Sequence, residues 1–129
     1  MDREIRLLQL LVCREFRQLK QDTFSATHVT TNFYASQFPF YFEQLCVVTC
    51  WRKDERFHKE VIEYATDYGA LVRNPHMDIE PAKDSVLFRW HTHCVPPDFG
   101  IEKPTVLTIR VFLDGNPVYE TYLLIEKLT

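Results

Sequence analysis

The chain has 129 residues, a formal net charge of −3 and 14 % aromatic residues. This length predicts a single domain over 1–129 that can bury a core without a metal ion or a disulfide. The charge gives no overall basic field for nucleic acid, and no segment approaches the ~20 apolar residues that cross a bilayer, so we expect neither nucleic acid nor a membrane as a partner.

Two segments are compatible with either a helix or a strand. Segment 3–19 is rich in Arg, Glu, Leu and Gln, which favours a helix, but its apolar run also fits a strand that is buried on both faces. Segment 57–68 carries apolar residues at helical spacing, with a candidate cap at either end. The competing interpretation is a strand across 58–66 that is followed by a turn at 67–69.

Two other segments alternate clearly and predict interior strands. In 45–52 the alternation leads us to place Trp51 on an outer face. In 85–94 it directs the even-numbered residues inward and directs His91 and His93 outward.

The clearest predicted element is a hairpin over 104–126. Its first run alternates from Leu107 to Leu113, and Asp114-Gly115 tolerates the positive φ angles of a type I′ turn before the second run begins. Pro117 cannot donate a hydrogen bond to a ladder, so we expect this end of the second strand at an edge or a strand start. Because a lone hairpin is marginal in water, other strands must cover its apolar face.

Four short patterns follow one another along the chain: Leu-Leu-Val-Cys-Arg at 10–14, apart from its first residue; Phe38-Pro39-Phe40; Asp67-Tyr68-Gly69; and Leu113-Asp114-Gly115 between two strands. In this order they resemble a family of small bacterial proteins of unknown function that are predicted to be immunoglobulin-like β-sandwiches. The resemblance implies that 3–19 is at least partly a strand and that 57–69 is a strand and a turn. It implies no activity and no functional residues.

We therefore predict an all-β fold, a two-layer antiparallel immunoglobulin-like sandwich of about seven or eight strands. The alternative is an α+β fold, with helices at 3–19 and 57–68 packed against an antiparallel sheet.

His91-Thr92-His93 is the spacing that most suggests a metal site. Residues i and i+2 of a strand point the same way, ~6.5 Å apart, and two imidazoles at that distance can share a zinc ion. Against a metal site at His91 and His93, Arg89 precedes them on the same face and repels a cation, and spacing identifies no third ligand. Two surface histidines are therefore the favoured interpretation. An enzyme would add an acid from a neighbouring loop, such as Asp98.

The four cysteines follow no zinc-finger or thioredoxin spacing, so we expect a cytoplasmic protein with reduced thiols. Cys46 and Cys50 on one strand would lie ~13 Å apart, which is too far for a disulfide, whereas a cross-strand pair with Cys94 is geometrically allowed. No nucleophile elbow or glycine-rich phosphate loop is present, so the sequence favours a non-catalytic protein that uses no cofactor.

An aromatic corner spans 38–42. It is either a plug at the open end of the sandwich or a partly exposed patch that binds a protein partner or a second copy of the chain. The candidate interface residues are Phe38, Phe40, Tyr41, Phe42, Trp51 and Phe112. We predict a non-catalytic binding or assembly module that acts through protein–protein contacts, with a homodimer as one form. The alternative is a metal-binding protein or enzyme that uses a surface His-x-His on a strand.

Overall fold

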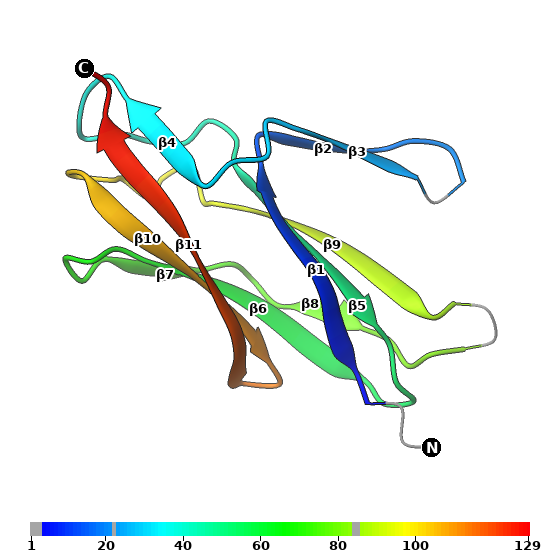
Figure 1. Ribbon diagram of the computed structural model, residues 1–129. Helices are drawn as coiled ribbons and strands as arrows, with labels where there is room; N and C mark the ends of the chain where they lie inside the picture. The colour runs from blue at the N-terminus through cyan, green and yellow to red at the C-terminus, as the bar shows by residue number, and fades with distance from the viewer. Residues whose placement is uncertain (1–3, 22, 84–85) are drawn as a thin grey trace.

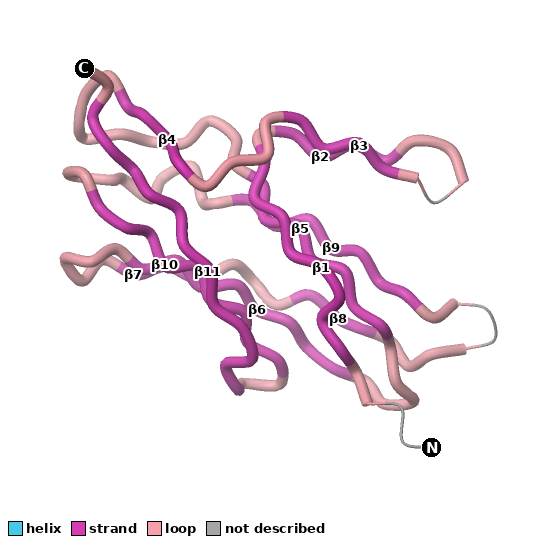
Figure 2. The backbone as a smooth tube through the Cα atoms, viewed as in Figure 1, coloured by secondary structure: helices cyan, strands magenta, loops and turns pink. Residues whose placement is uncertain are grey.

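The computed structural model describes residues 4–21, 23–83 and 86–129, and within them the chain forms strands, turns and loops but no helix (Figures 1 and 2). The described residues form eleven strands: β1 Arg6–Cys13, β2 Glu15–Gln18, β3 Phe24–Thr27, β4 Asn32–Ala35, β5 Cys46–Arg52, β6 His58–Ala65, β7 Leu71–Arg73, β8 Met77–Ile79, β9 Phe88–Cys94, β10 Thr105–Leu113 and β11 Asn116–Lys127. None of the described residues belongs to a helix of the length and apolarity that a bilayer crossing requires.

The predicted all-β class is confirmed, whereas its α+β alternative and the expected number of strands are wrong. The helices of the α+β alternative, at 3–19 and 57–68, are replaced by strands β1, β2 and β6, because strand pairing in the tertiary structure outweighs a weak local helix preference. The expected seven or eight strands are too few, since the chain also contains short strands of three or four residues that sequence alternation is too brief to reveal.

The strands form three sheets. One has the order β1-β5-β9, and a larger one has the order β4-β11-β10-β6-β7, with β8 also paired to β6. The third is the β2–β3 hairpin, which extends to one side in Figure 1. The strand pairs are antiparallel except β4 with β11, which run parallel.

The two larger sheets contribute to one hydrophobic core. Val47 and Trp51 of β5 belong to the same buried cluster as Ile62, Ile109 and Ile125 of the larger sheet. Trp51 is therefore buried in the core, and its predicted place on an outer face is wrong. Its indole ring adds a large apolar area to the shared interior.

A second, smaller cluster lies on the opposite face of the β1-β5-β9 sheet, beneath the β2–β3 hairpin. It contains Cys13, Cys46 and Val48, with Trp90 packed against it. The rings of Phe16 and Phe24 lie 5.8 and 4.8 Å from the Trp90 ring. This sheet is therefore covered with apolar side chains on both faces.

The predicted hairpin is confirmed as β10 and β11. Leu107 and Ile109 are fully buried, and Asp114 and Gly115 have φ angles of 52° and 83°. A register shift between Val111 and Phe112 makes a bulge near the turn. The edge character expected of this end of β11 is also seen, because β4 pairs only with Leu124–Lys127.

Candidate functional site

His91 and His93 lie in the interior of the protein and not on its surface. Their exposed fractions are 8 % and 1 %, so the predicted outward orientation is wrong. The predicted alternation of β9 is right, but the predicted inner face is wrong. Trp90 and the other even-numbered side chains lie on the face where the β2–β3 hairpin packs. Both faces of β9 therefore have neighbours, and apolar character alone did not identify the inner one.

Glu60 lies on β6 of the larger sheet and contacts the two histidines of β9. Its side chain is fully buried. One carboxylate oxygen, Oε1, accepts hydrogen bonds from His91 Nδ1 at 2.6 Å and His93 Nε2 at 2.9 Å. The same oxygen accepts from the Thr49 hydroxyl at 3.0 Å, and Oε2 accepts from the Trp51 indole N–H at 2.8 Å. Four donors therefore satisfy one buried carboxylate, as burial of a charged group requires.

These donors keep Glu60 ionised inside the core. Burial by itself would raise the pKa of Glu60, but the hydrogen bonds from His91 and His93 outweigh it and lower the pKa to about 2. His91 Nε2 lies 3.1 Å from the backbone carbonyl of Asp78, so both nitrogens of this ring face acceptors. Among the described residues, His93 Nδ1 has no hydrogen-bond partner.

Sequence reasoning missed Glu60, and it named Asp98 as the acid that could join the histidines. Asp98 is exposed in the loop after β9 and makes no hydrogen bond with His91 or His93 in the structure. A signal for Glu60 was present, because Glu60 alternates with Ile62 and Tyr64 on β6 and all three are fully buried. A carboxylate in a buried row requires a partner, and a histidine pair is a natural one.

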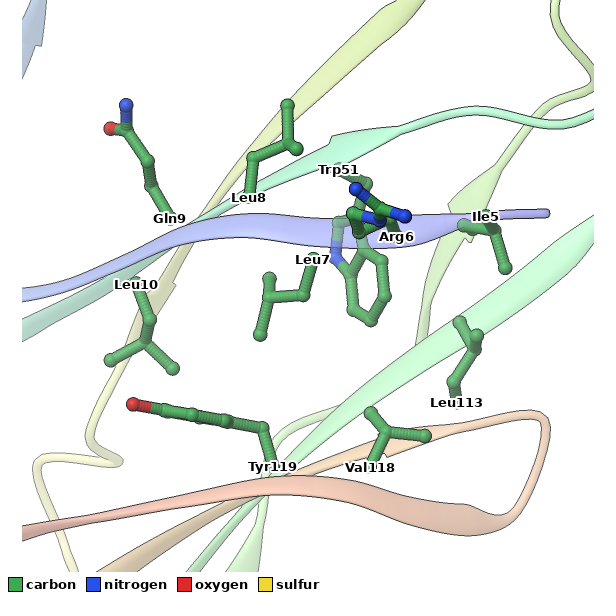
Figure 3. A pocket seen from close by; sticks show the side chains of 10 residues that line it. All are labelled: Ile5, Arg6, Leu7, Leu8, Gln9, Leu10, Trp51, Leu113, Val118 and Tyr119. Atoms are coloured by element: carbon green, nitrogen blue, oxygen red, sulfur yellow. The ribbon is translucent and has the colours of Figure 1, made fainter. Parts of the chain in front are cut away.

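A groove of about 390 Å³ opens between β1 and β11 (Figure 3). Figure 3 shows Leu7 and Leu10 of β1 pointing toward Val118 and Tyr119 of β11, with the Trp51 ring beside Leu7. Its lining is mostly apolar, as in most binding sites for small or extended ligands. Trp51 is also a donor to Glu60, so the same side chain touches the groove and the buried carboxylate.

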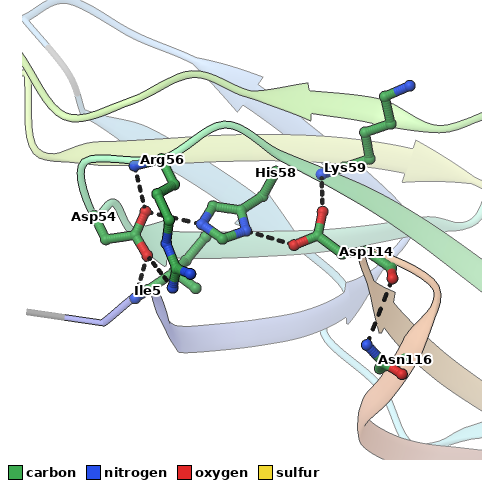
Figure 4. Close-up of polar contacts among 7 residues, drawn as sticks. All are labelled: Ile5, Asp54, Arg56, His58, Lys59, Asp114 and Asn116. Carbon is green, nitrogen blue, oxygen red and sulfur yellow. Dashed lines mark hydrogen bonds and ion pairs between the residues drawn. The ribbon is translucent and has the colours of Figure 1, made fainter.

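Figure 4 shows a charged clasp formed by His58, Asp54 and Asp114. It adjoins two residues that line the groove, because Asp54 accepts a hydrogen bond from the N–H of Ile5 and Leu113 precedes Asp114. The His58 ring lies between two carboxylates, with Nδ1 2.6 Å from Asp114 Oδ2 and Nε2 2.8 Å from Asp54 Oδ1. Asp54 Oδ2 accepts from the backbone N–H of Ile5 at 3.2 Å, and Asp114 Oδ1 accepts from the backbone N–H of Lys59 at 2.9 Å. The clasp therefore ties the start of β1 and the β10–β11 turn to β6.

The clasp is built from charged partners. Burial would lower the pKa of His58, but the hydrogen bonds to Asp114 and Asp54 raise it above its ordinary value. Burial would raise the pKa values of Asp54 and Asp114, but hydrogen bonds from backbone N–H groups and from His58 lower both. An imidazolium thus holds two carboxylates in place.

The predicted aromatic interface is only partly at the surface. Phe42 and Trp51 are buried, and Phe38 and Phe40 are partly buried against the core, which matches a plug more closely than a patch. The Phe42 ring lies 4.9 Å from that of Phe40. Tyr41 remains half exposed.

Phe112 is half-buried on the outer face of β10. The Arg73 guanidinium lies over its ring, 4.7 Å from the centroid. Phe112 is thus already covered in part by a side chain of the same chain.

Three cysteines lie in a row across the β1-β5-β9 sheet. Cys13 is the register partner of Cys46, and Cys46 is the register partner of Cys94, so the expected cross-strand neighbours are next to each other. All four thiols are free, and burial raises the pKa of Cys13 to about 11 and raises that of Cys94. Thiols that stay protonated are poor nucleophiles and poor metal ligands.

Comparison with known proteins leaves the family open. No family model matches the sequence, and no curated protein matches it. Among solved structures, the chain is similar to the Pseudomonas fluorescens alkylpurine DNA glycosylase AlkC bound to DNA containing an abasic site analog, with a TM-score of 0.51 and 13 % identity. The match covers 95 % of this chain and 30 % of that protein, and at this identity it is a likeness of fold alone.

Proposed function

We propose that this chain is a non-catalytic binding module, an immunoglobulin-like sandwich, that docks an extended segment of a partner protein in the groove between β1 and β11. One observation carries the proposal. The core-facing row of β11 is fully buried at Leu123 and Ile125, but it continues to Tyr119, which is 50 % exposed. Tyr119 pairs with Val111, which is itself buried, so this ring belongs to the inner face and lacks a cover.

The strands beside the groove present open backbone edges. Among the described residues, β1 is the last strand of its sheet, and β4 leaves the first part of β11, 116–123, without a paired strand on that side. An unpaired strand edge offers backbone donors and acceptors at regular spacing, and an extended peptide satisfies them by adding as a further strand. This geometry favours an extended chain over a compact ligand.

The side chains that line the groove indicate the sequence of the partner segment. The groove is lined by Leu7, Leu10 and Val118, so alternate residues of the partner segment should be apolar. Of the described residues that line the groove, Arg6 alone is charged, and it is exposed, so an acidic residue of the partner should lie opposite it. The net charge of −3 does not favour DNA as the occupant.

Other features support a module over an enzyme. The enzyme alternative relied on His91 and His93 at the surface, but both side chains are buried. The two larger sheets share one core, which supports the sandwich. The structural match covers 30 % of a longer enzyme, so a similar fold occurs there as one part of a larger protein, which supports a modular role. Free thiols support the expected cytoplasmic location.

The test is selection of binding peptides from a displayed library of ten-residue sequences that alternate apolar and polar positions and carry one acidic residue. We expect selected peptides to bind wild-type protein and to lose at least about tenfold in affinity with Tyr119→Ala, because that change removes an aromatic wall of the groove. Tyr122→Ala is the matched control, since Tyr122 is on the opposite face of β11 and is 52 % exposed. We expect it to bind the peptides as wild type does.

Hydrogen exchange reports the strand addition directly. The amides of 118–123 that do not already pair with β10 should become protected when the peptide binds. Equal loss of affinity in the two tyrosine variants, or unchanged exchange at this edge, would contradict the proposal. If light scattering shows a wild-type dimer and Tyr119→Ala is a monomer, the groove instead binds a second copy of the chain.

A further inference from the structure

We propose that Glu60, His91 and His93 form a binding site for one divalent cation, and that zinc fits it best. The inference does not depend on the docking groove. The two histidines come from β9 and the glutamate from β6, so the site would join the two larger sheets through their shared interior.

The donor atoms already converge. One ligand atom from each of the three residues lies within 4.8 Å of the other two. Two imidazoles and one carboxylate are a donor set that zinc takes in proteins, with bonds of ~2.0–2.2 Å. Donors around a tetrahedral zinc ion therefore lie ~3.3 Å apart. The distances of 2.6 and 2.9 Å from Glu60 Oε1 to the ring nitrogens need only a small side-chain adjustment to accept an ion.

Outer contacts hold two of the three ligands in a metal-binding orientation. His91 Nε2 faces the backbone carbonyl of Asp78 at 3.1 Å, which leaves Nδ1 directed toward Glu60. Glu60 Oε2 accepts the indole N–H of Trp51. A ligating imidazole that donates its second N–H to a carbonyl, and a ligating carboxylate that is itself hydrogen-bonded, are the usual second layer around protein-bound metals.

Binding exchanges protons for the ion. An imidazole that coordinates through one nitrogen carries its hydrogen on the other, so the hydrogen of His91 sits on Nε2 and that of His93 sits on Nδ1 when the ion is bound. Any further ring proton passes to solvent, and His91 Nδ1 and His93 Nε2 offer lone pairs to the cation. His91 keeps the hydrogen on Nε2 and its bond to Asp78. Three protein ligands leave one of the four positions of a tetrahedral zinc ion open. The Thr49 hydroxyl, 3.0 Å from Glu60 Oε1, is the neighbouring polar group.

The test measures bound metal in the whole chain, purified without a histidine tag, stripped with EDTA and then dialysed against zinc chloride. We expect one zinc ion per chain by elemental analysis. Zinc at a hundredfold excess over its Kd should raise Tm by about 10 °C, because a ligand that binds only the folded state stabilises it. His91→Gln and His93→Gln should lose the ion and the shift.

His76→Gln is the matched control. His76 is exposed, and its Nε2 lies 3.5 Å from an Asp78 carboxylate oxygen outside the buried cluster, so this variant should bind zinc as wild type does. A wild-type protein with no zinc above background, or equal losses in His76→Gln and His91→Gln, would overturn the proposal.

A second readout covers variants that fail to fold. The Trp90→Phe variant keeps Trp51 as its single tryptophan, and Trp51 donates a hydrogen bond to Glu60. Cobalt added to this variant after EDTA treatment should quench the fluorescence of Trp51. Unquenched Trp51 at saturating cobalt would also overturn the site. Peptide binding in the groove is a separate measurement, so either proposal can fail without the other.

Discussion

Asp54 offers the sharpest test of how the clasp holds the fold. Its Oδ1 accepts from the backbone N–H of Arg56 at 2.9 Å and from His58 Nε2 at 2.8 Å. Its Oδ2 accepts from the backbone N–H of Ile5 at 3.2 Å and from Arg56 Nη2 at 3.4 Å. In Asp54→Asn, an NH₂ group must replace one of these oxygens, so two donors face another donor in either orientation of the amide.

The expected cost follows from those lost acceptors. Asp54 is buried, and each buried partner left unsatisfied costs roughly 1–3 kcal/mol. We expect Asp54→Asn to lower the free energy of unfolding by about 3 kcal/mol, a large part of the 5–15 kcal/mol typical of a domain. With an unfolding entropy of ~2.1 cal/mol/K per residue, this corresponds to a fall in Tm of about 10 °C.

Urea denaturation followed by tryptophan fluorescence measures this change. Asp98→Asn is the control, because Asp98 is exposed in a loop, and it should stay within about 0.5 kcal/mol of wild type. If the midpoint of Asp54→Asn matches that of Asp98→Asn, the clasp contributes little to stability and the reasoning from its hydrogen bonds is refuted.

Three further predictions use the same structure. The pKa values of Asp54 and Asp114 are lowered in the folded protein, so both carboxylates stabilise it fully above the ordinary pKa of 3.8, and this stabilisation should be lost as the pH falls below that value. Urea midpoints measured across acid pH should therefore fall more steeply for wild type than for Asp54→Asn. Of the four cysteines only Cys94 is exposed, so an excess of thiol reagent should label one group in the native protein and four in denaturant. Labelling of all four in the native protein would contradict the buried positions of the other three. Gly115 has a φ of 83°, so Gly115→Ala should cost about 1 kcal/mol by strain at the turn, whereas Asn116→Ala should cost less, and equal urea midpoints for the two variants would count against that strain.

The sequence pattern was sufficient to predict elements whose structure depends on residues that are close together in the chain. The hairpin of β10 and β11 was predictable because alternation sets two faces and Asp114-Gly115 suits the turn between them. Segments 3–19 and 57–68 remained ambiguous because helix propensity differs by less than about 1 kcal/mol per residue. Pairing with strands far away in the chain resolved them as β structure.

The buried site lay beyond such patterns. A period of two shows that the faces of β9 differ, but it does not show which face is inner, and here the β2–β3 hairpin packs on the other one. His91 and His93 therefore read as surface residues until the facing sheet placed Glu60 against them, 31 and 33 residues away in sequence. Contacts between sheets depend on how the whole chain packs, and that packing alone brought one carboxylate to two imidazoles in the core.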